Sequence, residues 1–236
     1  AGATYQGLFR NPIVSPDLLG ASSGAGFGAA IALIYSLNLF WVSVISFATG
    51  TGAVFLAYMI SIVVSKRNHS GLLTLVLTGM IVASLFTAFI SLIKLVADPD
   101  SKLPAITYWL MGGLSSIVPQ NLMMLALSLL MAMIPLFLFS WRINLMSFDD
   151  DEAASMGLDV KKYRILFIVC ATLLTTASVA VSGVIGWVGL IIPHIARILV
   201  GPDYKKLMPA SLLTGAIFLM LVDDVTRCAF PSEIPL

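Results

Sequence analysis

Residues 72–97 read LLTLVLTGMIVASLFTAFISLIKLVA, a run in which Lys94 is the only charged side chain. A helix needs about 20 mainly apolar residues to cross the hydrocarbon core of a membrane, so this run is long enough. The whole chain has the same character. Of its 236 residues, 59% are hydrophobic and 11% are charged, and the mean hydropathy is +1.01. The sequence therefore predicts an all-α bundle of membrane-spanning helices.

The composition argues against several other classes of protein. Ordinary soluble domains are about half apolar and about a quarter charged. A soluble fold of this length exposes a large share of its residues to water, which disfavours a soluble enzyme and a disordered chain. The net charge of +1 offers no basic groove, so we expect no nucleic-acid partner.

Apolar runs between charged, proline-containing or glycine-containing breaks divide the chain, as one transmembrane domain over residues 1–236, into seven candidate crossings. The sixth is short and carries Pro193, so we expect it to be broken or tilted. The crossings lie near residues 18–37, 39–64, 72–97, 121–140, 163–182, 187–200 and 207–227.

The distribution of Lys and Arg predicts the orientation. If residues 1–17 are cytoplasmic, ten of the 13 basic residues fall on inner connections. The other three, Lys94, Lys102 and Arg227, fall on the outer side. Cytoplasmic connections carry an excess of Lys and Arg. We therefore expect a multi-pass protein of the cell (inner) membrane with its acid-rich connection, residues 147–162, in the cytosol.

Two connections do not look like spans. The apolar stretch 103–118 ends its helical part in paired glycines, which predicts a re-entrant or interfacial helix on the outer side. In the long polar connection, Ser147 is a candidate cap, four acids follow it, and Gly157 suits a helix stop. This pattern predicts two short cytoplasmic helices, over about 147–160, joined at Gly157.

Small residues indicate close helix packing in two places. Gly20, Gly24 and Gly28 recur every fourth residue, so one helix face has almost no side chains and another helix can approach it. A nucleotide-binding loop does not fit, because the spacing is not GxGxxG and no strand precedes it. A second group of glycines predicts a bend between the fifth and sixth crossings: Gly183, Gly186 and Gly189.

No catalytic or metal-binding constellation appears in the sequence. It contains no GxxxxGK[ST], HExxH or GxSxG motif, so we expect no ATPase site, cofactor or metal. Cys170 and Cys228 lack CxxC spacing, which favours buried free thiols. His69 lies in a basic loop and is expected to be solvated. We expect His194 to be hydrogen-bonded in helix packing; the alternative is that it lines a pathway.

Three charged residues near the end of the seventh crossing leave two interpretations open. Asp223 and Asp224 precede Arg227 by four and three residues, the spacing of neighbours on a helix. They either form a local ion pair that lowers the cost of charge near the interface, or leave Arg227 facing an acidic partner.

Several motifs, in this order along the chain, resemble the FecCD-type permeases, the membrane subunits of ABC importers for iron-siderophores, haem and cobalamin. Together they extend over nearly the whole chain. The motifs are QGLFRNP (6–12), PDLLG (16–20), SGAG (23–26), YWLMGG (108–113), EAASMGL (152–158) and GWVGLIIPHIAR (186–197).

The resemblance implies a fold of ten spans, of which the seven crossings correspond to the third to ninth. The chain is then expected to be a fragment that lacks the first one to two spans and the last. The resemblance also implies its partners: ABC ATPase subunits, an extracytoplasmic substrate-binding protein, a second permease subunit in a homodimer, and the lipid membrane.

The resemblance assigns roles to individual residues. It implies a coupling helix that docks on the ATPase, a periplasmic arginine that docks the binding protein, and small residues of the translocation pathway or of helix packing. The coupling residues are Glu152, Ala153, Ala154, Gly157 and Leu158; the docking residue is Arg227; the remaining group is Gly20, Gly24, Gly28, Met111, Gly112 and Gly113.

The implied function is import of a metal chelate by a permease that has no ATPase site and is powered by ATPase subunits. Iron-siderophore is the expected substrate, with haem, cobalamin or molybdate as others. The alternative is a secondary transporter driven by an ion gradient. Such transporters place ionisable residues near the bilayer midplane, whereas Lys94, Asp223 and Asp224 lie near span ends. An intramembrane enzyme would need a nucleophile and base or a metal site, which the sequence lacks.

Overall fold

The computed structural model describes residues 1–65, 71–114, 117 and 119–229. Every regular element in these ranges is a helix, which confirms the predicted all-α class. The chain divides into two compact units. Of the described residues, the first unit contains 1–16, 127–174 and 186–229, and the second contains 17–126 and 175–185.

Among the described residues, five helices are long and apolar enough to cross a membrane, and each coincides with a predicted crossing. They are α3 (Leu39–Ser65), α4 (Gly71–Val96), α6 (Pro119–Leu138), α9 (Val160–Ser182) and α11 (Tyr204–Ala229). At the other two predicted crossings the helices are shorter: α2 (Ala21–Ile34) and α10 (Val188–Val200). The number of crossings therefore stays a prediction at those two positions.

The backbone explains why α2 is shorter than the predicted crossing over residues 18–37. The chain first forms a single 3₁₀ turn, η1 (Pro16–Leu19). Gly20 then adopts φ +83°, outside the helical region, so α2 begins only at Ala21. At the other end Ser36 has φ +55°, which ends the helical path after Tyr35.

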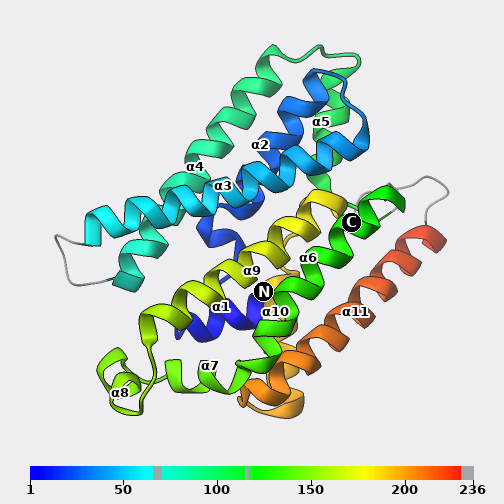
Figure 1. Cartoon of the computed structure of the whole chain (residues 1–236). Coiled ribbons are helices and arrows are strands. Elements are labelled where there is room, and N and C mark those ends of the chain that lie inside the picture. Colours follow the sequence, from blue (N-terminus) through cyan, green and yellow to red (C-terminus); the bar gives the residue numbers. More distant parts are fainter. Residues whose placement is uncertain (66–70, 115–116, 118, 230–236) are drawn as a thin grey trace. The chain divides into compact units, whose positions relative to one another are not determined.

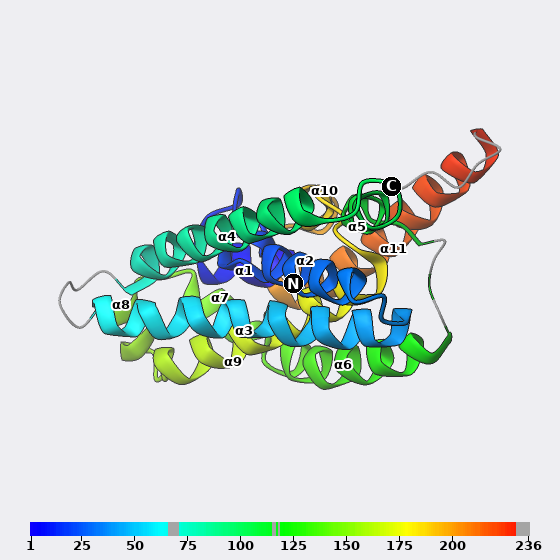
Figure 2. The same ribbon diagram turned by 90° about the horizontal axis from the view of Figure 1, so that it is seen from above.

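In the second unit, α2 packs against α3, α4 and α5 (Lys102–Met111), as Figures 1 and 2 show. Small buried residues make these approaches possible. Ala29 and Ala32 of α2 form one core cluster with Val42 of α3, and Ala53 and Ala57 of α3 form another with Val82 of α4. Close packing of this kind replaces a large apolar core, because lipid already solvates apolar side chains.

The short helix α5 confirms that the stretch after residue 102 is too short to span. Asp98 positions its start. The Asp98 carboxylate accepts hydrogen bonds from the backbone N–H groups of Asp100 (2.9 Å) and Ser101 (3.0 Å). These bonds lower the pKa of Asp98. Its backbone carbonyl accepts the N–H of Leu103 at 2.9 Å.

In the first unit, the short helix α1 (Gly2–Leu8) is buried along its whole length and contacts α7 (Ser140–Met146), α10 and α11. The Tyr5 hydroxyl lies 3.0 Å from the hydroxyl oxygen of Thr172 on α9. Arg197 of α10 donates to the Gln6 side-chain oxygen at 3.0 Å. Polar groups buried among apolar helices need such partners.

The acid-rich connection over residues 147–162 differs from the predicted pair of helices joined at Gly157. The two short helices are α7 and α8 (Asp150–Ser155), joined at residues 147–149, and Gly157 instead leads into the long α9. The cap of α8 is Asp149, not Ser147. Asp159 caps the start of α9, accepting the backbone N–H of Lys162 at 3.1 Å, and the helix is long because a mainly apolar run from Ile165 continues it.

The predicted bend between the fifth and sixth crossings lies between α9 and α10. Gly183 has φ +70°, and Trp187, the residue before α10, has φ +67° and is 74% exposed. Pro193 lies inside α10, which still runs to Val200. A break at Pro193 is therefore not observed, and the helix is short because it starts after the bend.

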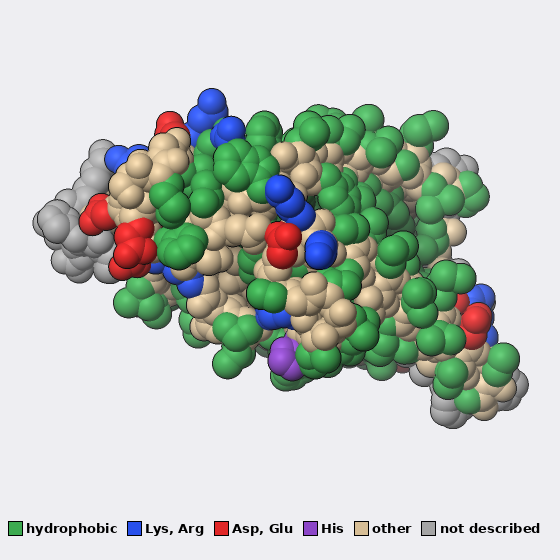
Figure 3. Space-filling view, turned by 90° about the horizontal axis from the view of Figure 1, so that it is seen from below, with side chains coloured by type: hydrophobic (Ala, Val, Ile, Leu, Met, Phe, Trp, Pro, Cys, Tyr) green, Lys and Arg blue, Asp and Glu red, His purple; other side chains and the backbone are tan. Residues whose placement is uncertain are grey.

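Apolar side chains dominate the surface of the long helices. In the apolar 18-residue segment of each helix, only 17% is buried in α4 and 6% in α11. In Figure 3 hydrophobic side chains are spread along the face shown, and charged ones gather in small groups. Exposed apolar surface of this extent marks contact with lipid or other protein.

Two predictions about single residues are wrong, and one lies outside the described ranges. Cys170 is buried, as predicted, but Cys228 is exposed because it lies near the end of the poorly covered α11. His194 is exposed on α10, and it makes no hydrogen bond within the described ranges, so it has no packing role there. His69 is not among the described residues.

Candidate functional site

The acidic first turn of α8 lies in a cluster of charged side chains that are joined by ion pairs. Asp150, Asp151 and Glu152 occupy that turn, and Asp149 precedes it with extended backbone (φ −62°, ψ 156°). Carboxylates are favourable at this end of a helix because the backbone N–H groups there carry partial positive charge. A helix of six residues is nevertheless too short to be stable alone, so other parts of the chain must hold it.

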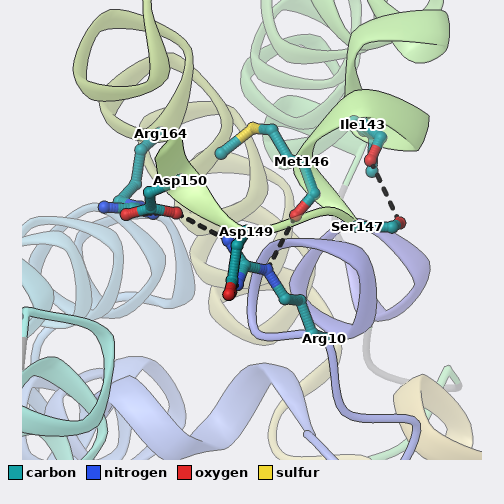
Figure 4. Close-up of polar contacts among 7 residues, drawn as sticks. All are labelled: Arg10, Ile143, Met146, Ser147, Asp149, Asp150 and Arg164. Carbon is teal, nitrogen blue, oxygen red and sulfur yellow. Dashed lines mark hydrogen bonds and ion pairs between the residues drawn. The ribbon is translucent and has the colours of Figure 1, made fainter. Parts of the chain in front are cut away.

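Arg10, which follows α1, holds α8 to α7. Its Nη1 lies 2.6 Å from Asp149 Oδ1 and its Nη2 lies 2.6 Å from Asp150 Oδ1. Its Nε donates to the backbone carbonyl of Met146, the last residue of α7, at 3.0 Å. One guanidinium thus binds the carbonyl end of α7 and the acidic start of α8, as Figure 4 shows.

Arg164 of α9 supports the same carboxylate from another side. Its Nη2 lies 2.8 Å from Asp150 Oδ1 and 2.9 Å from Oδ2 (Figure 4). The Arg10 and Arg164 side chains are 26% and 18% exposed, whereas Asp149 is 82% exposed. Single exposed ion pairs contribute only about 0.2–1 kcal/mol. The network matters because it connects three parts of the chain: Arg10, which lies two residues after α1, the start of α8, and Arg164 in the first turns of α9.

The end of α8 is fixed by its backbone. Gly157 has φ +84°, and its N–H donates to the carbonyl of Ala154 at 2.9 Å. The N–H of Leu158 donates to the carbonyl of Ala153 at 3.1 Å, and both of these side chains are buried. This pair of bonds is a Schellman motif, which needs a left-handed residue at the glycine position. The prediction that Gly157 ends a short helix is confirmed.

The structure separates the predicted coupling residues into two groups. Ala153 and Leu158 point inward, and Glu152, Ala154 and Gly157 are exposed. Two exposed apolar side chains that were not predicted flank the helix: Phe148 (50% exposed) and Met156 (46%). The only sequence signal that would have found them is the EAASMGL motif, which contains Met156 and begins four residues after Phe148.

Asn144 ties α7 to the start of α11. Its Nδ2 donates to Asp203 Oδ1 at 2.7 Å, and its Oδ1 accepts the backbone N–H of Tyr204 at 3.0 Å. The bond from Asn144, together with the backbone N–H of Lys205, lowers the pKa of Asp203. α7 is therefore attached at two places, to Arg10 through the Met146 carbonyl and to Asp203, which precedes α11, through Asn144.

At the other end of α11, Arg227 pairs with Asp223. Arg227 Nε lies 2.7 Å from Asp223 Oδ2, and the Arg227 side chain is 52% exposed. The pairing is the four-residue spacing predicted from the sequence. It coexists with an exposed guanidinium, so the local pair does not remove Arg227 from contact with other molecules.

The three glycines of the predicted stripe do not share one neighbour. A Cβ on Gly24 would lie 2.5 Å from Ala53 Cβ, and one on Gly28 would lie 2.8 Å from the carbonyl oxygen of Ile45. Both therefore face α3. Gly20 precedes α2, and a Cβ there would lie 3.3 Å from the backbone nitrogen of Ala83 on α4.

The predicted pathway residues at the end of α5 lie beside the end of α9. Met111, the last residue of α5, is 52% exposed. Gly112 has φ +73°, and a Cβ there would lie 2.6 Å from the carbonyl oxygen of Val184. The N–H of Gly113 donates to the carbonyl of Ser182 at 2.7 Å. These contacts leave no room for a side chain at position 112.

Arg10 and Arg164 are functional candidates that sequence reasoning missed. Arg10 belongs to the QGLFRNP motif, but nothing in the spacing connects it to carboxylates 139 and 140 residues away. Arg164 lies 14 residues from Asp150, beyond the reach of neighbours on one helix.

Comparison with known proteins gives consistent matches. The chain is 39% identical over 236 residues to the molybdate import system permease MolB of Haemophilus influenzae, covering 100% of this chain and 69% of that protein. It is 38% identical over 238 residues to a protein of Helicobacter pylori described as an iron chelatin transport system permease, covering 100% and 70%. A solved metal-chelate type ABC transporter in an inward-facing conformation matches with a TM-score of 0.92 and 38% identity, over 99% of this chain and 75% of that one.

The apolar helices, the short acidic helix α8 and these matches define the class: a multi-pass membrane permease of an ABC importer for metal chelates. The sequence model of the FecCD transport family matches residues 1–236, and the chain belongs to this family. The resemblance stated from the motifs is therefore confirmed. Permeases of this family lack an ATPase site of their own, and they work with ATPase subunits and a binding protein.

Proposed function

We propose that α8 docks on a cytoplasmic ABC ATPase and that this contact drives the import of an iron chelate. The observation that supports docking is the combination of an exposed face and a rigid attachment. Glu152, Ala154 and Met156 are exposed, while Ala153 and Leu158 anchor the helix. A helix that transmits motion must be accessible to its partner and fixed to the rest of the chain.

The attachment supports this role further. Arg10 and Arg164 connect α8 to the end of α1 and to α9. A displacement of α8 by an ATPase would then act on those helices directly rather than be absorbed by a loose loop. Transport in this scheme is conformational, because ATP binding and hydrolysis occur in the partner subunits.

Two glycines allow a matched test of docking. Gly157 and Gly201 both have φ above +80°, both have open space at the Cβ position, and only Gly157 ends α8. Valine in a left-handed conformation is strained at both positions. In the full-length protein we expect Gly157→Val to weaken co-purification of the ATPase subunits at least about tenfold, a loss of about 1.4 kcal/mol. Gly201→Val is expected to leave it unchanged.

Equal effects of the two valine variants would show that backbone strain, not α8, is responsible, and would contradict the docking role. A charge reversal on the exposed face, Glu152→Lys, gives a second measurement that leaves the Schellman turn intact. We expect it to weaken ATPase binding in a salt-dependent way, since exposed charge interactions are screened.

Iron chelate is the proposed substrate, with molybdate as the second candidate. The iron chelatin and molybdate permeases cover the whole chain at 38% and 39% identity, so identity alone does not separate them. Cells that express the full-length permease with its ATPase and binding protein are expected to accumulate radiolabelled ferric siderophore. Accumulation of molybdate without ferric siderophore would establish the second candidate instead.

The proposed assembly is a homodimer of permeases with two ATPases and one extracytoplasmic binding protein. Arg227, exposed at the end of α11, is proposed to meet an acidic residue of the binding protein. Met111, Gly112 and Gly113 are proposed to flank the translocation pathway, supported by the exposure of Met111 and by the tight turn that follows it.

A further inference from the structure

Arg142 on α7 is enclosed by aromatic rings. Its Cζ atom lies 4.1 Å from the ring centroid of Tyr163, 5.0 Å from that of Trp141 and 5.1 Å from that of Phe139. Phe139 and Tyr163 also pack edge to face, with centroids 5.5 Å apart. A guanidinium within about 6 Å of a ring centroid is attracted by the ring, so the three rings hold this cation in place.

The same cation has no anionic partner in the part of the chain that the structure describes. Within the described ranges Arg142 takes part in no ion pair, unlike Arg10, Arg164 and Arg227. Its Nε is buried and donates no hydrogen bond to any described residue. Ring faces cover the planes of a guanidinium, but they do not use the N–H donors along its edge. A partly buried cation with unused donors is costly unless an acceptor completes it.

The surroundings indicate where that acceptor comes from. α7 begins two residues after the apolar helix α6 ends, and Leu138 (66% exposed) and Trp141 (41%) lie at this junction. Tryptophan at the end of a span is typical of the headgroup region of a membrane. Lys161 and Lys162, both exposed, directly precede Tyr163 and add positive charge. The distribution of Lys and Arg puts this end of α6 on the cytoplasmic side.

We propose that Arg142, held by Tyr163, Trp141 and Phe139, binds the phosphate of an anionic lipid headgroup in the cytoplasmic leaflet. The rings occupy the faces of the guanidinium and leave its edge for a phosphate, which accepts two parallel N–H bonds. A lipid fits better than a carboxylate of the ATPase, because Leu138 and Trp141, the exposed residues that precede Arg142 in the chain, are apolar and lie at the end of a span. This site does not depend on the docking role of α8.

The experiment uses the full-length permease with its ATPase subunits in nanodiscs of phosphatidylcholine, with or without phosphatidylglycerol. We expect phosphatidylglycerol to raise the unfolding temperature of the wild type. In Arg142→Gln the phosphatidylglycerol fraction that gives half of this rise is expected to increase at least about tenfold, since charge-assisted bonds are lost. Lys205→Gln, which removes an exposed cytoplasmic charge elsewhere, is the matched control and is expected to respond like the wild type.

Trp141→Leu keeps the cation but removes an exposed ring, and it tests the site if Arg142→Gln does not fold. It too is expected to require more phosphatidylglycerol than the wild type. Equal lipid responses in the wild type and these variants would overturn the proposal. Millimolar inorganic phosphate in phosphatidylcholine discs distinguishes the source: if it reproduces the rise, the site binds a free anion instead of a lipid. Loss of ATPase binding in Arg142→Gln with an unchanged lipid response would assign Arg142 to the ATPase interface, which would also overturn it.

Discussion

Arg10 shows how one side chain can organise a polar cluster. All three nitrogen positions of its guanidinium are used, on the Met146 carbonyl and on the carboxylates of Asp149 and Asp150. A lysine has a single ammonium and cannot span these acceptors in a planar fork. Arg10 is also one of the few residues other than glycine with positive φ, at +52°. The backbone strain is consistent with a side chain that must reach a fixed place.

The first residue-scale prediction concerns Arg10. Arg10→Gln is expected to lower the free energy of unfolding by about 1–3 kcal/mol, because a buried carbonyl and two carboxylates lose a charged partner. Arg10→Lys should fall between this variant and the wild type. Chemical denaturation of the full-length protein in detergent measures the change. If the glutamine variant is as stable as the wild type, the network does not hold α8.

The second residue-scale prediction compares two helical glycines. A Cβ at Gly24 would lie 2.5 Å from Ala53 Cβ and 2.9 Å from the carbonyl oxygen of Thr49, whereas a Cβ at Gly52 meets nothing within 4 Å. Gly24→Ala is expected to cost about 1–3 kcal/mol through overpacking. Gly52→Ala is expected to be neutral or stabilising, since alanine favours helix. Thermal unfolding measures both, and equal destabilisation would contradict the close approach of α2 and α3.

The third residue-scale prediction separates the two interpretations of Arg227. Arg227→Glu is expected to weaken binding of the extracytoplasmic binding protein by about 2 kcal/mol at low salt, about thirtyfold in Kd. Asp223→Asn removes the local ion pair and keeps the arginine, so it should leave that Kd nearly unchanged. A binding titration with both variants distinguishes the roles. If Arg227→Glu changes stability but not the Kd, the pair is only local.

At the scale of elements, α7 and α8 depend on tertiary contacts. They have seven and six residues, too few to be stable alone. Arg10 holds the last residue of α7 through a hydrogen bond to its carbonyl. Asn144 of α7 is bonded to Asp203, the residue before α11. α8 is held by ion pairs at its start and by the Gly157 turn at its end. We therefore expect these short helices to move together with the helices to which they are attached.

The pH dependence of the α7–α11 attachment can be predicted. The bond from Asn144 lowers the pKa of Asp203 in the folded state. Its contribution to stability is therefore present above the unfolded pKa of about 3.9, and it is lost as the pH falls through the folded pKa. Asp203→Asn is expected to lose stability at pH 7 and to show a smaller further loss on acidification than the wild type. Unfolding temperatures against pH measure this difference.

The control for this experiment is Asp151→Asn. Asp151 is exposed on α8 and makes no ion pair among the described residues. This variant should keep the wild-type dependence on pH. If Asp203→Asn also keeps it, the Asn144–Asp203 contact does not contribute to the acid sensitivity of the fold.

At the scale of the whole molecule, the energy source is the decisive property. In an ABC importer the membrane subunit is driven by its ATPases, so uptake is expected to stop when the ATPase subunits are removed. A proton uncoupler should leave uptake intact as long as ATP is maintained. Uptake that continues without ATPase and collapses with the uncoupler would restore the alternative of a secondary transporter.

Much of the molecule was predictable from local sequence. Long apolar runs predicted α3, α4, α6, α9 and α11, because crossing a membrane demands length and low charge whatever the neighbours are. The stop at Gly157 was predictable because left-handed backbone favours glycine. The short α2 was not, since the 3₁₀ turn and the unusual φ of Gly20 depend on packing against α4.

The amino-acid sequence was enough to predict a helical membrane protein of the FecCD type, with an acid-rich helix as its candidate coupling site. The folded structure was needed to find which residues hold that helix, which of its side chains are exposed, and that three rings enclose Arg142. The physical reason is the range of the forces involved. Apolar runs and turn residues act within a few positions of the chain. Arg10 and Asp150 are 140 residues apart in the sequence and come into contact only when the chain folds.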